Sequence, residues 1–268
     1  MNLLKYTIRF LRHQIDASSN HSIHSPKVYH FNNTLFRSHK YYQPFNSLKQ
    51  LDSHWQADQS EIEIVDLGAG SRTNSAKKRR VSDIHKNSGK PIKIREFLFK
   101  LVDELHPETI VELGTSLGVT SAYLALARPA ATVITLEGCK NTLNKAKEGF
   151  DLIGVKNVVP KLGGFDAQFP EVMRSVERID LLFIDGNHTE EATLRYFEMS
   201  LEKVHAGSVI VFDDIYWSKG MMRAWEKIKA HPKVSLSLDF FLIGLVFFEE
   251  RKHTEHYRLR VPLKTVLS

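Results

Sequence analysis

Cysteine is nearly absent from this chain of 268 residues, in which Cys139 stands alone. One thiol excludes an intrachain disulfide and a zinc site built from cysteines. No apolar run approaches the roughly 18 residues that a membrane-spanning helix needs. The first residues alternate charged and apolar side chains and lack the continuous apolar stretch and small-residue cleavage site of a signal peptide. We therefore expect a cytoplasmic protein without a membrane partner.

Positive charge is concentrated in the first third of the chain. Residues 1–95 contain 16 Lys and Arg against 7 Asp and Glu, whereas residues 96–268 contain 21 against 24. A basic region of this kind attracts an anionic small molecule, RNA or a phosphorylated group, although an ordinary solvated surface explains the same charges. The oligomeric state is not predicted.

Helix and strand patterns alternate from about Ile92 onward, which predicts an α/β sheet with crossover helices. The expected strands are Thr109–Leu113, Thr132–Glu137, Asn157–Leu162, Ile179–Asp185 and Ser208–Asp213, followed by two β-rich runs, Val234–Phe240 and Leu242–Phe248. The expected helices are Ile92–Leu105, Val119–Ala127, Asn141–Ile153, Asp166–Ser175, Thr189–Val204 and Lys219–Ala230. The short gap between the two final runs permits only an antiparallel hairpin.

These patterns predict a seven-stranded Rossmann-like sheet with five parallel strands and a terminal antiparallel hairpin. A dehydrogenase sheet would normally end in a sixth parallel strand instead. We divide the chain into a basic, mainly helical N-terminal cap (residues 1–91), a sheet domain (residues 92–250) and a C-terminal tail (residues 251–268).

The stretch Ile110–Ala127 is the most informative part of the chain. It predicts a buried strand, a glycine turn and a helix. Gly114 and Gly118 bracket the turn, where glycine lets a ligand approach the backbone closely. The start of the helix offers unpaired N–H groups and a partial positive charge, which suit a nucleotide-like cofactor. The spacing does not match the Gly-x-Gly-x-x-Gly dinucleotide fingerprint.

A neater copy of this pattern occurs earlier, at Ile64–Ser71. The basic run at residues 72–80 follows it, where an apolar helix ought to pack on the sheet. No second strand with a terminal acid comes about 20 residues later, as ribose binding would require. We therefore place the cofactor at Ile110–Ala127. Two interpretations of the loop Asp66–Ser71 remain: a turn that positions the cap, or part of an anion or substrate site.

The Glu-x-Gly-x-x-x-Gly turn resembles motif I of the class I S-adenosylmethionine (SAM)-dependent methyltransferases. The resemblance covers about residues 92–250 and implies SAM as the cofactor. Glu137 ends the second strand, where a carboxylate faces the ribose. Asp166 has two possible roles, a contact with adenine or the N-cap of a helix. The expected cofactor residues are Glu112, Gly114, Thr115, Ser116, Gly118, Glu137, Gly138, Phe165, Asp166 and Asp185.

Three carboxylates end the fourth and fifth strands: Asp185, then Asp213 and Asp214. Ligand sites of open α/β sheets lie at the carboxyl ends of strands, so these acids are expected to converge. Such acids repel unless protonated or neutralised, and their oxygens suit Mg²⁺ or another hard divalent cation. The arrangement resembles the catechol O-methyltransferase group, which carries Asp-Asn after strand five. The Asp-Asp pair departs from that pattern, and a metal-free site is the alternative.

His188 follows Asp185 by three residues, where the same group carries its catalytic lysine. It precedes a predicted helix, whose dipole disfavours the protonated imidazole. A neutral imidazole is what a general base for a hydroxyl nucleophile requires. We therefore predict His188 and Asp185 as catalytic residues. The alternative for His188 is a bond within the helix cap alongside Asn187.

The segments Ile184–His188 and Val211–Asp214 resemble the family-24-type, O-methyltransferase-like branch, and the basic front is similar to its Bacteroidetes members. The chain lacks the Asn/Asp-Pro-Pro-Tyr segment of amino-methylating enzymes, and its cysteine follows strand two rather than strand four or five. The expected reaction is therefore methylation of a hydroxyl on a small molecule or sugar. A nucleic-acid methyltransferase and a non-catalytic SAM-binding protein are the alternatives.

Overall fold

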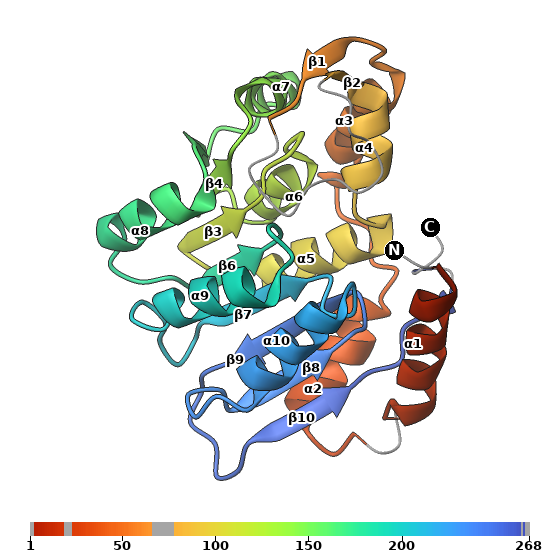
Figure 1. Ribbon diagram of the computed structural model, residues 1–268, viewed down its shortest axis with the longest axis vertical. Coiled ribbons are helices and arrows are strands. Elements are labelled where there is room, and N and C mark those ends of the chain that lie inside the picture. The colour runs from red at the N-terminus through yellow and green to blue at the C-terminus, as the bar shows by residue number, and fades with distance from the viewer. Residues whose placement is uncertain (1–2, 19–22, 66–77, 264, 266–268) are drawn as a thin grey trace. The chain divides into compact units, whose positions relative to one another are not determined.

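The computed structural model describes residues 3–18, 23–65, 78–263 and 265 (Figure 1). The Asp66–Ser71 loop lies outside these residues. The chain divides into two compact units, one formed by His39–Ser175 and the other by Met1–Ser38 together with Val176–Ser268. Among the residues described, no helix combines the length and the apolar character needed to cross a membrane.

The unit His39–Ser175 contains three parallel strands and an antiparallel pair. Its strands are β1 (Glu61–Glu63), β2 (Lys78–Arg80), β3 (Thr109–Leu113), β4 (Thr132–Glu137) and β5 (Val158–Leu162). Its helices are α3 (Phe45–Ala57), α4 (Val81–Ser88), α5 (Ile92–Leu105), α6 (Val119–Ala127), α7 (Lys140–Leu152) and α8 (Phe165–Ser175). Strand β4 lies between β3 and β5 and runs parallel to both, while β1 pairs antiparallel with β2. The parallel arrangement brings the carboxyl ends of β3 and β4 to one edge, where the glycine turn begins.

The second unit contains both parallel and antiparallel strands. Its strands are β6 (Leu181–Ile184), β7 (Val209–Asp213), β8 (Leu236–Asp239), β9 (Ile243–Phe247) and β10 (Glu255–Arg258). Its helices are α1 (Leu3–Asp16), α2 (Pro26–His30), the π-helical segment η2 (Phe31–Phe36), α9 (Glu190–Ser200) and α10 (Lys219–Lys229). Strand β7 pairs parallel with β6 and antiparallel with β9, which forms a hairpin with β8.

Buried aliphatic and aromatic side chains form the core of each unit. All residues of β6, β7, β8 and β9 are buried. The apolar runs of β6, β7 and β9 predict this for strands that are covered on both faces, whereas β8 alternates apolar and polar residues. Helix α5 buries the apolar stripe expected from its periodicity, including Ile94, Leu98 and Leu101. These cores hold the strand ends, from which the polar side chains of the site project.

The predicted α/β fold with parallel strands and a terminal antiparallel hairpin is confirmed, and β3, α6 and β4 have the predicted bounds. The helical character of the N-terminal region is also confirmed. Two strands were not expected. Strand β2 lies in the basic run of the predicted helical cap. Strand β10 lies in the segment assigned to a tail and pairs parallel with β8. Its sequence, Glu-His-Tyr-Arg, is polar and only half-buried, so it lacks the apolar run by which the other strands are recognised.

Candidate active site

The glycine turn has the backbone that its sequence predicts. Gly114 and Gly118 both adopt positive φ angles, 109° and 76°, and Ser116 between them has φ 48°. A Cβ atom on Gly118 would come within 2.7 Å of the Phe150 ring, so a side chain does not fit there. The N–H groups of Gly114 and Thr115 donate to the carbonyl of Leu136, 3.0 and 3.2 Å away, which ties the turn to β4.

Glu112 is fully buried near the end of β3 and binds hydroxyl groups from two other elements. Its Oε2 atom accepts a hydrogen bond from Ser121 of α6 and another, 2.6 Å long, from Thr135 of β4. Thr135 also lies 2.6 Å, oxygen to oxygen, from Thr115 in the turn. A buried carboxyl costs free energy unless it is hydrogen-bonded. This network therefore joins β3, the turn, α6 and β4 around one acid.

Glu137 ends β4 and is oriented by backbone N–H groups. Its Oε2 accepts from the N–H of Ser116 at 2.8 Å and its Oε1 from the N–H of Cys139 at 2.8 Å. Burial raises the pKa of the Glu137 carboxyl above its ordinary value, although these hydrogen bonds act in the opposite direction. Each carboxylate oxygen has a second lone pair. The side chain is thus fixed at the edge of the turn with acceptor capacity left for a ligand.

Cys139 connects this edge to the β1–β2 hairpin, a contact that was not predicted. Its buried Sγ lies 3.4 Å from the N–H of Val65 and 3.5 Å from the carbonyl of Glu63. Asn141 donates to the same carbonyl at 2.9 Å. These contacts join residues that are 74 or more positions apart in the sequence. No local sequence pattern indicates such contacts, so they could not be predicted.

The other predicted cofactor residues of this unit take ordinary positions. Gly138 and Phe165 are partly exposed, and Phe165 begins α8. Asp166 is exposed in the first turn of α8, so it follows the start of the helix and is not its N-cap. An acidic residue in the first turn stabilises the helix dipole. Its contact with adenine remains a prediction.

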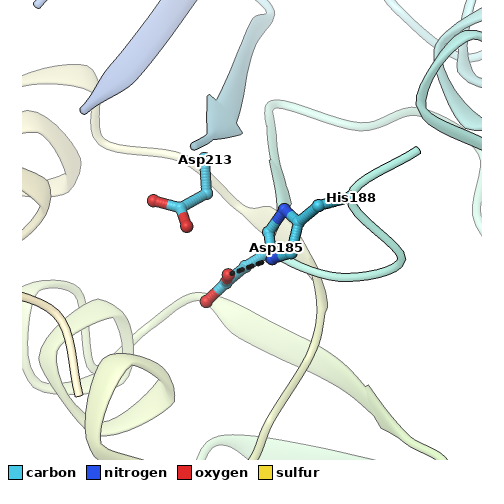
Figure 2. A group of neighbouring side chains, drawn as sticks. All are labelled: Asp185, His188 and Asp213. Atoms are coloured by element: carbon cyan, nitrogen blue, oxygen red, sulfur yellow. Dashed lines mark ion pairs between the residues drawn. The ribbon is translucent and has the colours of Figure 1, made fainter. Parts of the chain in front are cut away.

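Asp185, His188 and Asp213 lie together in the second unit, as Figure 2 shows. Asp213 is the last residue of β7 and is buried, whereas Asp185 directly follows β6 and is partly exposed. One ligand atom from each of the three residues lies within 4.8 Å of the other two. The parallel pairing of β6 and β7 explains why two acids far apart in sequence meet here.

His188 faces two carboxylates. Its Nε2 atom lies 3.8 Å from Oδ1 of Asp185 and 4.0 Å from Oδ2 of Asp214. The cap of α9 is formed by Thr189, whose Oγ1 accepts the N–H of Ala192 at 3.3 Å. Thr189 therefore takes the N-cap role that was the alternative for His188. The imidazole of His188 lies beside the acids instead.

Asp214 differs from Asp213 in its backbone. It has φ 54°, and its N–H donates to the carbonyl of Leu242 at 2.8 Å. Side chains of successive residues in a strand point to opposite faces, so a change of direction is needed for both acids to serve one site. The tight group of possible metal ligands contains His188, whereas the sequence predicted Asp214 in that place. Asp214 remains within ion-pair distance of the imidazole.

Helix α1 and the segment after β7 form a buried network that was not predicted. Tyr216 Oη donates to Asp239 Oδ2 at 2.7 Å, and its ring stacks on Phe241 at 4.9 Å between centroids. His13 Nε2 lies 2.9 Å from the other oxygen of Asp239. Arg9 donates to the carbonyls of Tyr216 and the next residue. Burial raises the pKa of Tyr6 in α1, and the negative charges of Asp214 and Asp213 raise it further.

The chain matches a known family model for a methyltransferase domain over residues 111–215. These residues include the glycine turn, Glu137, Asp185, His188 and the Asp213–Asp214 pair. Among curated proteins it is 30% identical over 131 residues to the uncharacterized protein R132 of Acanthamoeba polyphaga mimivirus, a match that covers 46% of this chain and 59% of that protein. The chain therefore spans about three fifths of the length of this relative.

Solved O-methyltransferase structures share the fold. A putative O-methyltransferase from Klebsiella pneumoniae matches with a TM-score of 0.56 and 19% identity, covering 82% of this chain and 96% of that one. The O-methyltransferase of Bacillus cereus in complex with S-adenosylhomocysteine (SAH) matches with a TM-score of 0.56 and 19% identity, covering 81% of this chain and 96% of that one. The O-methyltransferase TomG of Streptomyces achromogenes, in complex with SAM, matches with a TM-score of 0.53 and 17% identity, covering 82% of this chain and 97% of that one. Residues 111–215 thus match a methyltransferase domain, and the fold of the chain is the one that these solved methyltransferases share.

Proposed function

We propose that this protein transfers the methyl group of SAM to a hydroxyl oxygen of a small molecule or sugar. The observation that carries this proposal is the position of His188, whose Nε2 faces the carboxylates of Asp185 and Asp214 at 3.8 and 4.0 Å. A histidine beside two acids at the ends of β6 and β7 is suited to remove a proton from a hydroxyl group. The family match and the O-methyltransferase folds support the same chemistry.

The first role of the chain's residues is to bind the cofactor. When bound, SAM would supply a sulfonium methyl group, which an oxygen nucleophile would attack in line with SAH as the leaving group. Glu137 would accept hydrogen bonds from the ribose hydroxyls, because its carboxylate is already oriented by the N–H groups of Ser116 and Cys139. The turn from Gly114 to Gly118 would offer backbone groups at close approach. Accurate alignment of this kind supplies much of the barrier reduction in a displacement reaction.

The second role is proton transfer. As the acceptor oxygen bonds to the methyl carbon and the sulfur–carbon bond breaks, the hydroxyl proton would pass to Nε2 of His188. The products are the methyl ether, SAH and an imidazolium. Asp185 and Asp214 would stabilise that imidazolium through their negative charges. The proton then leaves to solvent, since the His188 side chain is a quarter exposed.

The same site fits a divalent cation. Asp185, His188 and Asp213 offer two carboxylate oxygens and one imidazole nitrogen within 4.8 Å of one another. Small side-chain movements would let the three donors share one ion, because metal–ligand distances of about 2.0–2.3 Å place two ligands at most about 4.6 Å apart. Mg²⁺ prefers oxygen donors alone, whereas a mixed set with imidazole also suits Mn²⁺, Fe²⁺ or Zn²⁺. An ion held there would polarise the acceptor hydroxyl and ease its deprotonation. This is an alternative to proton transfer to His188, because a metal-bound imidazole nitrogen cannot accept the proton.

Three cations of the N-terminal region face acids, which supports a small acceptor over a nucleic acid. In β2, Arg80 and Lys78 lie directly opposite Glu61 and Glu63 of β1, where unlike charges on paired strands attract. Arg95 forms an ion pair with Asp52 at 2.5 Å. Cations used in such contacts contribute less to an extended phosphate-binding surface.

Calorimetric titration with SAH, with and without Mg²⁺ or EDTA, tests the cofactor. We expect binding in every condition, weakened about tenfold or more by Glu137→Ala because a charged hydrogen bond is lost. Glu191→Ala is the matched control, because Glu191 is exposed in the first turn of α9. The absence of SAH binding to the unchanged protein would refute the proposal.

Radiolabelled SAM tests the acceptor. The protein is incubated with a panel of catechols, phenols and sugars and, separately, with RNA. Label that enters a small hydroxyl compound supports the proposal, while label found only in RNA would favour the nucleic-acid alternative. Tight SAH binding with no transfer to either pool would indicate a non-catalytic SAM-binding protein.

A further inference from the structure

Helix α1 carries a second apolar stripe, which is exposed in the part of the chain that the structure describes. Leu4, Ile8, Leu11 and Ile15 are 69, 41, 54 and 78% exposed. Their spacing of four, three and four residues places them within about 60° of one another on an α-helix of 3.6 residues per turn. Single exposed aliphatic residues are common on protein surfaces, but an aligned row of four is a feature of interaction sites.

The inward face of the same helix is firmly anchored in its unit. Phe10 and His13 are buried on the side opposite the stripe, and Phe10 contacts the Phe241 ring at 5.1 Å between centroids. Gln14 donates to the carbonyl of Val261 at 2.9 Å. These contacts hold α1 as a helix and fix which face points outward. The stripe is therefore exposed on a helix that is already packed into its unit through its other face.

Two cations and one acid lie beside the stripe. Lys5 and Arg12 are exposed and lie on the same flank, since positions seven residues apart nearly superimpose on a helix. Asp16 is the single acid within the helix bounds, and its carboxylate pairs with Arg258 at 3.0 Å. The exposed face of α1 thus combines large aliphatic side chains with cations. This combination is typical of helices that lie in the interface of an anionic bilayer.

A second copy of the chain fits this face less well. In an antiparallel pairing along the stripe, Lys5 of one copy would approach Arg12 of the other, and like charges repel. Four partly exposed aliphatic side chains offer on the order of a few hundred Å², whereas a standard interface buries about 800 Å² per partner. A lipid surface needs no shape complementarity and accepts both the apolar row and the cations.

We propose that α1 docks this protein on anionic lipid surfaces, with Leu4, Ile8, Leu11 and Ile15 inserted between headgroups and with Lys5 and Arg12 at the lipid phosphates. Insertion of such a helix is shallow, about 5–10 Å, and leaves the folded units outside the bilayer. The proposal departs from the expectation that the chain has no membrane partner. It concerns peripheral binding, which does not need a spanning helix.

Vesicle flotation of the full chain tests this docking. The vesicles contain phosphatidylcholine alone or phosphatidylcholine mixed with phosphatidylglycerol. We expect binding to the mixed vesicles that weakens as salt is raised, and little binding to the neutral ones. The double variant Ile8→Gln/Leu11→Gln should lose most of the binding to the mixed vesicles. The double variant Lys5→Gln/Arg12→Gln should lower the partition coefficient about fivefold for each cation removed.

Leu152→Gln/Val159→Gln is the matched control, because these two aliphatic residues are 41 and 39% exposed in the other unit. It should bind vesicles as the unchanged protein does, and circular dichroism checks that every variant is folded. Equal binding by the Ile8/Leu11 variant would overturn the proposal, and so would a failure of the unchanged protein to float with anionic vesicles at low salt. A dimer that the Ile8/Leu11 variant dissociates, without vesicle binding, would assign the stripe to a second copy instead.

Discussion

His13 and Asp239 form a buried pair across 226 residues of sequence, with Nε2 of the imidazole 2.9 Å from Oδ1 of the carboxylate. The pair holds α1 against the end of β8, and Tyr216 donates to the second carboxylate oxygen from the segment that follows β7. One acid thus joins the N-terminal helix, the hairpin and the segment beside Asp213 and Asp214. The amino terminus is a structural part of the unit that carries the candidate catalytic group.

Loss of this pair should destabilise the protein. In His13→Ala, Asp239 stays buried with one partner fewer, and breaking a buried pair costs about 3 kcal/mol or more. Urea denaturation at pH 7 measures the change. His205→Ala is the control, because its Nε2 lies 2.8 Å from Asp180 but its side chain is 38% exposed. Pairs at the surface contribute less than about 1 kcal/mol. Equal losses in the two variants would show that burial of His13 does not matter.

Acid should remove the contribution of Asp239 to stability. Burial acts to raise the pKa of this carboxyl, but the hydrogen bonds from His13, Tyr216 and the Phe241 N–H outweigh burial and hold the pKa below its ordinary value. A carboxyl with a lowered folded-state pKa stabilises the fold above its unfolded pKa, near about 4, and loses that contribution as the pH falls below it. The free energy of unfolding should therefore decline below about pH 4, and less steeply in Asp239→Asn. Parallel slopes in the two proteins would contradict this assignment.

Gly118→Ala should destabilise the glycine turn more than a positive φ angle alone explains. The new Cβ would lie 2.7 Å from the Phe150 ring and 2.9 Å from the Ala146 Cβ. Gly154→Ala is the matched control, since Gly154 has a similar φ of 72° and a Cβ added to it would meet no atom within 4 Å. The control should lose about 1–2 kcal/mol from backbone strain, and Gly118→Ala about 1–3 kcal/mol more from overpacking.

Thermal or urea unfolding of both glycine variants measures these differences, and SAH titration reports on the turn itself. We expect SAH affinity to fall in Gly118→Ala and to stay unchanged in Gly154→Ala. If both variants unfold alike and bind SAH alike, Phe150 does not constrain the turn.

The elements around the glycine turn could be predicted from sequence because their determinants are local. The apolar run of β3, the glycine pair and the apolar helix α6 follow one another within Thr109–Ala127, and the structure reproduces their bounds. Parallel strands also bring their carboxyl ends together, which predicted the meeting of Asp185 and Asp213.

The remaining features depend on distant pairing or on backbone direction. His13 and Asp239 are joined only through the tertiary fold, and β10 is recognisable as a strand only beside β8. The positive φ of Asp214 turns the chain just after the strand, which the repeated Asp-Asp sequence does not reveal. For this reason the sequence grouped three acids, whereas the closely spaced ligand set includes His188.

Manganese should bind the Asp185–His188–Asp213 group more tightly than magnesium. The reason is the imidazole nitrogen, which Mn²⁺ accepts as a ligand more readily than Mg²⁺ does. Calorimetry of the metal-stripped protein with each ion measures both affinities. His188→Ala should reduce the preference for Mn²⁺, and Asp213→Asn should weaken both ions. If neither ion binds the unchanged protein, the acids and His188 act without a metal.

His188→Ala should lower the rate of methyl transfer about 10²- to 10⁴-fold at neutral pH, the range that general-base catalysis contributes. Its affinity for SAH should not change, because the proposed cofactor contacts of the ribose and the glycine turn lie on β3, the turn and β4. His231→Ala is the control: this imidazole also lies beside a carboxylate, 3.9 Å from Glu198, but outside the acid cluster. The residual rate of His188→Ala should rise with pH, as hydroxide and the ionised acceptor replace the missing imidazole. A rate equal to that of the unchanged protein, measured with an identified acceptor, would exclude His188 as the base and leave alignment of the two substrates as the main source of catalysis.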